Sequence, residues 1–460
     1  MAKRVMYIFT LIVLLMVVSA FSQEKKSVRI AVIDTGFSAD AISAANISEG
    51  KNYILPDNTA DDIEGHGTAV ASIIVGSETA GVDGICPSAV IVPLVYYTKK
   101  EDGSIVRGDL RMTAKIIRDA VDVYKCDIIN ISSGTARKSF ELEQAVKYAE
   151  EKGILIVSSA GNDGGSEIYY PGGYDSVLCV GALGEDDGGA ASFSNRHSDV
   201  DILAPGSNIK VADIDGTQLA VSGTSFSAAY VTGVVAGIMA EHPELSALKI
   251  RKLLKSSAKD MCTPGFDNES GWGMVDASAA DGYADVGRLF RDVKPDAWYF
   301  KEVNEATEFG IMSGTDEVTF SPLIPTTRAM LWTMLYRIDG GNSSSADDVW
   351  YSAAQKWSVE NGISDGTKPN DAITREQIAT ILHRYAKLKG KDVSAGNSEN
   401  LASYSDFSSV SEYAVEAMQF MVDNGCLKGK STTTLNPRDT ATRAEIAAIL
   451  VRFLRMCNDL

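Results

Sequence analysis

The chain has 460 residues, enough for two to four domains, and 45% of them are hydrophobic, as in ordinary globular proteins. Acidic residues outnumber basic ones by 61 to 43, so the net charge at pH 7 is -18. A nucleic-acid-binding protein needs a basic face, and we therefore expect no nucleic-acid partner.

The first residues have the organisation of a secretory signal peptide. Two basic residues, Lys3 and Arg4, precede an apolar run at 5–18, and small residues follow it up to Ser22. This order predicts a signal peptide at 1–22 that is cut from the mature protein. The run is shorter than the roughly 20 residues of a membrane span, although an uncleaved N-terminal anchor is the alternative. We expect a secreted protein without membrane attachment after cleavage.

The cysteines show none of the spacings of metal-binding motifs, and the sequence contains no C-x-x-C pair. We therefore expect no metal site built from cysteine. An even number of cysteines in a secreted chain permits disulfides, but the spacing fixes no pairing among Cys86, Cys126, Cys179, Cys262, Cys426 and Cys457.

Strand-like and helix-like stretches alternate over residues 28–282, the expected first large domain. Near-continuous apolar runs, which suit strands buried in a parallel sheet, lie at 28–33, 89–95, 128–131, 154–157 and 177–180. Helical stretches lie at 68–75, 112–123, 140–151 and 227–241. This alternation predicts a doubly wound α/β fold with a mostly parallel sheet. Ligands bind such sheets at the carboxyl ends of the strands, where Asp34 falls.

Four glycine-rich motifs in this domain supply the parts of a serine hydrolase. They are V-I-D-T-G at 32–36, G-H-G-T at 65–68, S-A-G-N-D-G at 159–164 and S-G-T-S-F-S at 222–227. Ser225 is the predicted nucleophile, His66 the base that takes its proton, and Asp34 the acid that orients the imidazole. Asn162 is the predicted amide donor to the oxyanion.

Two of these motifs have other interpretations when taken alone. The Asp34 motif is also that of an aspartic protease, but that enzyme class needs a second D-[ST]-G, and none is present. Ser225 precedes a helix, where serine is commonly an N-cap. A decayed, inactive homologue is a further alternative, although every residue that the triad requires is intact.

The order Asp, His, Ser and the glycines around these residues resemble the subtilisin-like serine proteases, over about residues 27–281. The resemblance implies that a peptide pairs with the segment 130–134, through Ser132 and Gly134, by strand addition. It also implies that Asp163 lies at the rim of the P1 pocket, which takes the side chain before the scissile bond. A basic P1 preference and a solvated loop acid are the two interpretations of Asp163.

The same resemblance bears on cofactors. The family often holds a structural calcium at 75–84, but here the usual asparagine is missing and Ser43 stands where an aspartate is expected. We expect no required cofactor and, at this loop, weak calcium binding at most.

The C-terminal part is a threefold repeat, at 290–342, 346–390 and 404–457. In each copy an aromatic residue precedes a glycine by twelve positions, a second glycine follows four residues later, and a Thr-Arg pair opens a helix. Threonine with Glu or Gln three residues on predicts a capping box in the second and third copies. In the first copy, Met330 occupies that third position.

These copies resemble S-layer homology modules, which are mainly α-helical and hold an anionic, pyruvylated cell-wall polysaccharide. The resemblance implies polymer contacts by Arg328, Arg375 and Arg443, and stacking of sugars on Trp298 and Trp350. The alternatives are a structural ion pair within each unit for the arginines and core packing for the tryptophans.

The sequence as a whole therefore predicts a secreted serine endopeptidase, held at the bacterial cell wall, that acts on protein or peptide substrates through an acyl-enzyme. Two alternatives stay open: an inert surface or adhesion protein with the same fold, and a dedicated maturation protease with one partner substrate.

Overall fold

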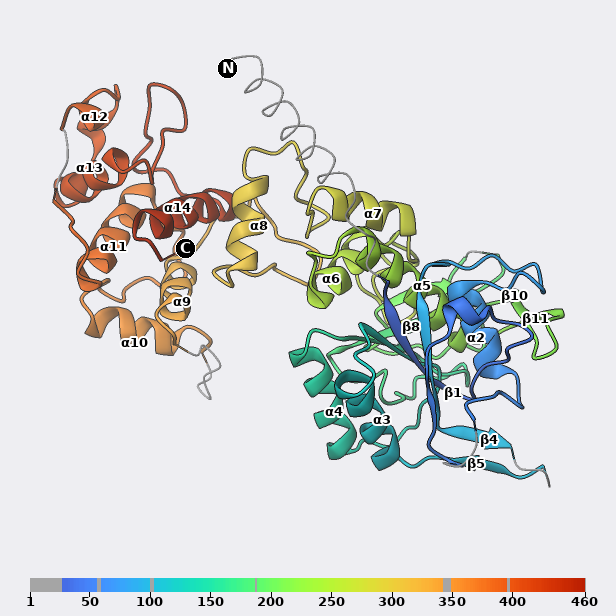
Figure 1. Cartoon of the computed structure of the whole chain (residues 1–460). Coiled ribbons are helices and arrows are strands. Elements are labelled where there is room, and N and C mark those ends of the chain that lie inside the picture. The colour runs from blue at the N-terminus through green and yellow to red at the C-terminus, as the bar shows by residue number, and fades with distance from the viewer. Residues whose placement is uncertain are drawn as a thin grey trace, which may run out of the picture. The chain divides into compact units, whose positions relative to one another are not determined.

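The computed structural model describes residues 27–55, 59–99, 103–186, 188–341, 349–394 and 398–459. The predicted signal peptide at 1–22 lies outside these ranges. The chain divides into two compact units between Asp285 and Val286 (Figure 1). Over the described ranges, we find no helix with the length and apolar character needed to cross a membrane.

The first unit is built on a seven-stranded sheet in the order β2-β3-β1-β6-β7-β8-β9, in which every neighbouring pair is parallel. The strands are β1 (Arg29–Asp34), β2 (Lys51–Asn52), β3 (Val90–Val95), β6 (Ile128–Ile131), β7 (Leu155–Ser159), β8 (Val177–Leu183) and β9 (Ile202–Pro205). The five predicted strands are thus confirmed. The two that the sequence missed, β2 and β9, are the short edge strands.

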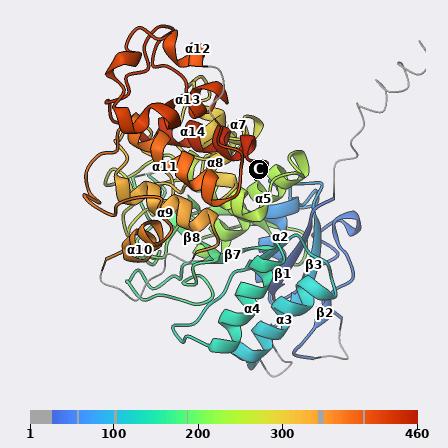
Figure 2. The same ribbon diagram turned by 90° about the vertical axis from the view of Figure 1, so that its left-hand side faces the viewer.

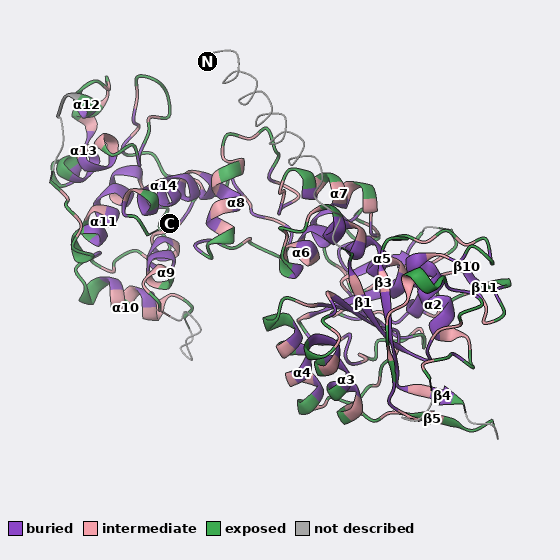
Figure 3. Ribbon diagram, viewed as in Figure 1, coloured by how far each residue is buried: buried purple, intermediate pink, exposed green. Residues whose placement is uncertain are grey.

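Helices cover both faces of this sheet, as the apolar strands require (Figures 1 and 2). Helices α3 (Leu110–Asp122) and α4 (Phe140–Glu151) share one core with strands β1, β3 and β6. Helices α2 (His66–Val75) and α5 (Thr224–Glu241) pack together against the other face. Fifteen of the eighteen residues of α5 are buried (Figure 3), which makes it the central helix of the unit.

Four further strands, one 3-10 turn and two helices complete the first unit. Two antiparallel hairpins project from it, formed by β4 (Tyr97–Lys99) with β5 (Ile105–Arg107) and by β10 (Ile209–Ala212) with β11 (Gln218–Val221). A 3-10 turn, η1 (Ala44–Asn46), and helices α6 (Ala247–Ser257) and α7 (Ala277–Asp285) were not predicted. The doubly wound prediction is confirmed, and the hairpins are additions to it.

The second unit is helical and repeats the same pair of helices three times. The first helices are α8 (Phe300–Glu308), α10 (Ser352–Glu360) and α13 (Val415–Asp423), and the second helices are α9 (Arg328–Ile338), α11 (Arg375–Leu388) and α14 (Arg443–Met456). Short elements precede α13: α12 (Ser398–Ala402), η2 (Phe407–Ser409) and η3 (Glu412–Ala414). The three second helices meet in one core around Trp332, Tyr385 and Phe453.

Each second helix begins where the Thr-Arg pair predicted it. Thr374 with Gln377 and Thr442 with Glu445 form complete capping boxes, whereas Thr327 caps its helix without a return bond from Met330. Isolated backbone bridges join the three helix starts pairwise, at Pro325–Thr442, Thr327–Ala372 and Thr374–Thr440. The repeats therefore close into a ring in which each contacts both others.

Candidate active site

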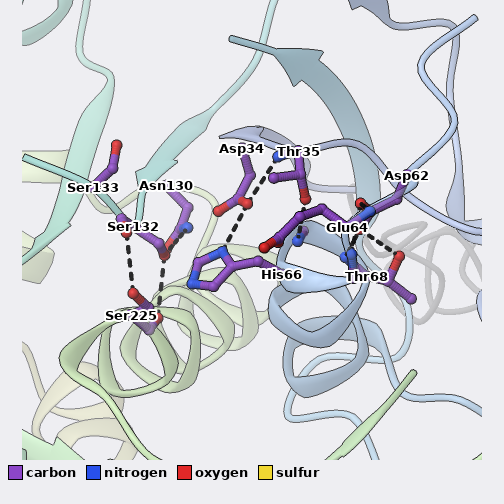
Figure 4. A network of polar contacts seen from close by, with 12 residues as sticks. Asp34, Thr35, Asp62, Glu64, His66, Thr68, Asn130, Ser132, Ser133 and Ser225 are labelled. Atoms are coloured by element: carbon purple, nitrogen blue, oxygen red, sulfur yellow. Dashed lines mark hydrogen bonds and ion pairs between the residues drawn. The ribbon is translucent and has the colours of Figure 1, made fainter. Parts of the chain in front are cut away.

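The acid and the base lie together at the carboxyl end of the sheet. Asp34 is the last residue of β1 and is 4% exposed, and His66 is the first residue of α2. The Nδ1 atom of His66 lies 2.7 Å from Oδ1 of Asp34, which also accepts a 2.8 Å bond from the amide of Thr35. Figure 4 shows the second ring nitrogen of His66 on the side of Ser225. The carboxylate therefore fixes the imidazole with Nδ1 as donor, as a base in this role requires.

The start of α2 is held by a carboxylate that the sequence analysis missed. Asp62 is buried and accepts bonds of 2.9 Å from the amides of Glu64 and Gly65 and of 2.9 and 2.8 Å from the amide and hydroxyl of Thr68. Aspartate at a helix start satisfies amides that have no partner within the helix. The N-cap of α2 is Gly65 and Asp62 lies before it, so no capping motif in the sequence marks this carboxylate.

A close approach of two chain segments also orients His66. The amide of Gly67 donates a 2.7 Å bond to the hydroxyl of Thr35. A Cβ at Gly67 would lie 2.3 Å from the carbonyl oxygen of Gly36, so only glycine fits there. The G-H-G pattern is therefore a packing requirement that brings the start of α2 against the end of β1.

The nucleophile is anchored to the segment that follows β6. Ser225, the second residue of α5, donates a 3.0 Å bond from its hydroxyl to the carbonyl oxygen of Ser132, and the Ser132 hydroxyl donates a 3.2 Å bond to the carbonyl of Ser225. Asn130 on β6 donates to the Ser132 hydroxyl at 2.9 Å and accepts from Thr232 of α5 at 2.9 Å. Figure 4 shows this network beside His66. Gly223, not Ser225, is the N-cap, so the N-cap interpretation of Ser225 is wrong.

The predicted oxyanion donor is held in one orientation. The Oδ1 atom of Asn162 accepts bonds from the amide and the hydroxyl of Thr224, at 2.9 and 2.8 Å. The Thr224 hydroxyl in turn accepts a 3.3 Å bond from the amide of Gly161. Because the oxygen of the Asn162 amide is engaged, its Nδ2 group is free to donate on the exposed side.

Comparison with known proteins decides the family. The sequence model of the subtilase family matches residues 25–273, more than half of the chain. Subtilisin BL of Lederbergia lenta is 34% identical over 254 residues, which cover 55% of this chain and 90% of that protein. The chain belongs to the subtilase family. The minor extracellular protease Epr of Bacillus subtilis is also 34% identical, over 55% of this chain and 38% of its own length.

Solved structures agree with this subtilase assignment. Fervidolysin from Fervidobacterium pennivorans, a keratinolytic enzyme related to subtilisin, matches with a TM-score of 0.52 and 30% identity over 56% of this chain and 43% of its own. A mutant of the protease domain of PatA matches with a TM-score of 0.51 and 28% identity, over 58% of this chain and all of that domain.

The helical unit of this subtilase matches a second family. The model of the S-layer homology domain matches residues 289–329 and 403–447, the first and third repeats. The middle repeat lies outside these matches, but α10 and α11 follow the same order and the same Thr-Arg start. Domains of this type bind cell-wall polymers and attach proteins to the cell surface.

The three predicted polymer-binding arginines contact the next repeat around the ring. Arg328 pairs with Asp365 and donates to the carbonyl of Thr367. Arg375 donates to the carbonyls of Lys428 and Leu435, and Arg443 to those of Ser313 and Phe320. The alternative of an ion pair within each repeat is therefore wrong. The bonds run from each repeat to the next, and of these three arginines only Arg328 pairs with a carboxylate.

Two grooves between repeats contain two of these arginines, Arg375 and Arg328, whereas Arg443 lines neither groove. One, of about 440 Å³, is lined by Trp298, Arg375, Lys428, Gly429, Lys430, Glu445, Ala448, Ile449 and Arg452. The other, of about 320 Å³, includes Arg328, Arg384 and Tyr413. Trp298 and Trp350 are 61% and 51% exposed, so the interpretation that they pack in the core is wrong. The first groove combines one exposed indole with four cationic side chains and one carboxylate, that of Glu445, which pairs with Lys430.

The electrostatics of the active site set a testable pH dependence. Burial disfavours the charged imidazole, but the charge and hydrogen bond of Asp34, with the charges of Glu64 and Asp62, raise the pKa of His66 from 6.5 to about 9. Only the neutral imidazole can take a proton from serine. The value of kcat/KM is therefore expected to rise with pH through about 9 rather than through 6.5.

A charge-removal variant checks this cause. Glu64→Gln removes one of the charges that raise the pKa of His66, so the rising limb of the pH profile should move to lower pH. Glu78→Gln is the matched control, because Glu78 is not among the groups that shift His66. A wild-type limb near 6.5, or equal profiles for Glu64→Gln and wild type, would contradict the account.

Proposed function

We propose that this protein is a secreted serine endopeptidase, attached to the bacterial cell wall, that hydrolyses peptide bonds through an acyl-enzyme on Ser225. The observation that supports this most is the convergence of four side chains on one edge of the sheet. Asp34 holds His66, whose free nitrogen faces Ser225, and Thr224 turns the amide of Asn162 outward. Each group is placed by a different element, and together they form one reaction centre.

The proposed reaction follows from these positions. The Ser225 hydroxyl leaves its bond to the Ser132 carbonyl and rotates toward Nε2 of His66, which takes its proton as the oxygen attacks the substrate carbonyl carbon. The negative charge on the carbonyl oxygen is met by Nδ2 of Asn162. His66 then protonates the leaving amine, and water hydrolyses the resulting ester by the same steps.

Digestion of an unfolded protein tests this function. The secreted chain, incubated with casein, is expected to produce peptides cut at many sites. Casein that stays intact while Ser225 reacts with an active-site label would favour the dedicated maturation protease. Casein that stays intact with Ser225 unreactive would favour the inert surface protein.

We propose further that the 440 Å³ groove binds an anionic secondary cell-wall polysaccharide. Trp298 offers an exposed indole face, on which a sugar ring can stack, above a groove that also contains Lys428, Lys430 and Arg375. A polymer that carries carboxylates along a chain of sugars matches this pairing of aromatic and cationic groups. Trp298 is 61% exposed, so its replacement removes little buried surface from the fold.

Replacement of Trp298 tests the groove. Trp298→Ala is expected to weaken binding of the full chain to purified cell walls by about 10-fold, because an aromatic anchor at the centre of a site commonly contributes more than 1 kcal/mol. Phe309→Ala is the matched control, since Phe309 is 56% exposed in the same repeat but does not line the groove. Equal binding by both variants, or undiminished binding to walls stripped of polysaccharide, would contradict the proposal.

We propose that catalysis and folding need no bound metal. In the loop where relatives hold calcium, Ser77 donates its hydroxyl to the carbonyl of Ala41, at 2.6 Å, and Gln218 donates its amide to the carbonyl of Ala80, at 3.0 Å. Calcium needs six to eight oxygen ligands, and at this loop side-chain donors already occupy one acceptor position on each of these two carbonyls. No cluster of three metal-binding side chains occurs within the described ranges.

Thermal unfolding tests this calcium independence. Excess EDTA is expected to leave the unfolding temperature within about 2 °C of its value with calcium, because a ligand stabilises only a protein that binds it. A rise of more than about 5 °C on calcium addition would contradict the proposal.

A further inference from the structure

Two chain segments flank the reaction centre beyond the ends of two strands, and we call the space between these segments the crevice. Strands β6 and β7 pair as far as Ile131 and Ser158, and beyond this point their chains continue separately as 132–134 and 160–163. Ser132 is bonded to Ser225, and Asn162 belongs to the opposite wall. If a peptide binds as proposed above, with its scissile carbonyl between Ser225 and Asn162, the side chain of the P1 residue enters this crevice.

Tyr169 extends across this crevice from one wall to the other. A Cβ added to Gly134 would lie 3.1 Å from Cβ of Tyr169, and a Cβ added to Gly161 would lie 3.0 Å from the ring atom Cδ2. The side chain therefore begins against the first wall and reaches the second. Because the residue at each of these two points is a glycine, the Tyr169 side chain contacts the backbone of each segment directly.

The position of Tyr169 is fixed at both ends. Its phenol donates a 2.5 Å bond to Oδ2 of Asp163. Its neighbour Tyr170 exchanges two backbone bonds with Thr135, of 2.8 and 3.1 Å, which tie the segment to the strand side of the crevice. Because the backbone beside it is tied down, the ring can swing aside for a large substrate group only by breaking its bond to Asp163. Asp163, which the sequence left as a basic-P1 determinant or a solvated acid, is exposed and accepts this bond from the ring hydroxyl.

We propose that Tyr169, anchored by Asp163, fills the far part of the P1 crevice and restricts cleavage to bonds that follow small residues such as Gly, Ala and Ser. This inference rests on the proposed peptidase function and adds its substrate class. Its physical basis is exclusion, because a packed aromatic ring leaves no volume for a second large side chain. Discrimination of this kind is commonly 10- to 200-fold for groups that differ by little more than a methylene.

Cleavage-site profiling tests the proposal. The full chain is incubated with a proteome-derived peptide library, and the P1 residues of the products are identified by mass spectrometry. We expect small residues to dominate for wild type and large apolar residues to appear for Tyr169→Gly and Tyr169→Ser, with the Phe-to-Ala ratio at P1 rising at least about 10-fold. Tyr169→Phe keeps the ring but loses its bond to Asp163, so it is expected to raise the Phe-to-Ala ratio at P1 less than Tyr169→Gly and Tyr169→Ser do.

The outcomes separate this proposal from the function on which it rests. Ser225-dependent cleavage after large residues by the wild type would overturn the proposal about Tyr169 and leave the peptidase function standing. An unchanged P1 profile in both Tyr169→Gly and Tyr169→Ser would do the same. The absence of Ser225-dependent cleavage by every variant would overturn both.

Discussion

Replacement of Ser225 by alanine is expected to lower kcat by about 10⁶-fold, a magnitude known from subtilisin itself rather than derived from this geometry. The hydroxyl is the group that forms the acyl-enzyme, and Figure 4 shows Ser225 on the side of the second ring nitrogen of His66. Activity on casein or a peptide substrate, measured in the full chain, checks the loss. Residual activity within about 100-fold of wild type would contradict the assignment.

Two controls separate lost chemistry from lost folding. Ser225→Ala removes one hydrogen bond to the Ser132 carbonyl, so the free energy of unfolding should fall by only about 1 kcal/mol. Ser198→Ala removes an exposed hydroxyl that bonds to the neighbouring Asp199, and it should change neither stability nor kcat. A Ser225→Ala protein that unfolds many degrees earlier would show that the lost activity had a structural cause.

Replacement of Asn162 by alanine is expected to lower kcat by about 10²–10³-fold with little change in KM, again a size known for this donor in subtilisin. The amide of Asn162 stabilises negative charge on the substrate oxygen, and this charge develops only as the nucleophile attacks. Its loss therefore affects the transition state and not the bound substrate. Steady-state kinetics on one peptide substrate separate the two constants. A higher KM with an unchanged kcat would mean that Asn162 binds the ground state instead.

Thr224 offers a graded version of the same test. Its hydroxyl and its amide both hold the Oδ1 atom of Asn162. Thr224→Val removes the hydroxyl and keeps the amide, so the orientation of Asn162 is weakened rather than lost. We expect a fall in kcat of about 10-fold, smaller than for Asn162→Ala, since one bond of the pair remains. A larger loss than in Asn162→Ala would contradict this ranking.

The sequence predicted those parts of the site that depend on local order. The triad residues lie within short motifs, and each motif marks a strand end or a helix start, so the fold brings them to one edge of the sheet. The capping boxes of α11 and α14 were equally local, because each is complete within four residues. These predictions needed only the position of a residue within its own element.

The missed features depend on contacts between distant segments. Arg443 bonds to residues 123 and 130 positions earlier, and no spacing rule within a repeat reveals a ring that closes through the neighbouring repeat. The edge strand β2 has only two residues, too few for any pattern, and β9 ends in Pro205, a residue that is atypical of strands. The sequence analysis did not single out Tyr169, because only the folded chain places its ring between Gly134 and Gly161.

The central claim is that Ser225 is a nucleophile activated by His66, and active-site labelling tests it most directly. The full secreted chain is treated with a fluorophosphonate, which reacts with activated serine hydroxyls, and the adduct is located by peptide mass mapping. The account predicts one adduct, on Ser225, that is lost in His66→Ala. A folded wild-type protein without an adduct on Ser225, or an adduct that persists in His66→Ala, would contradict it.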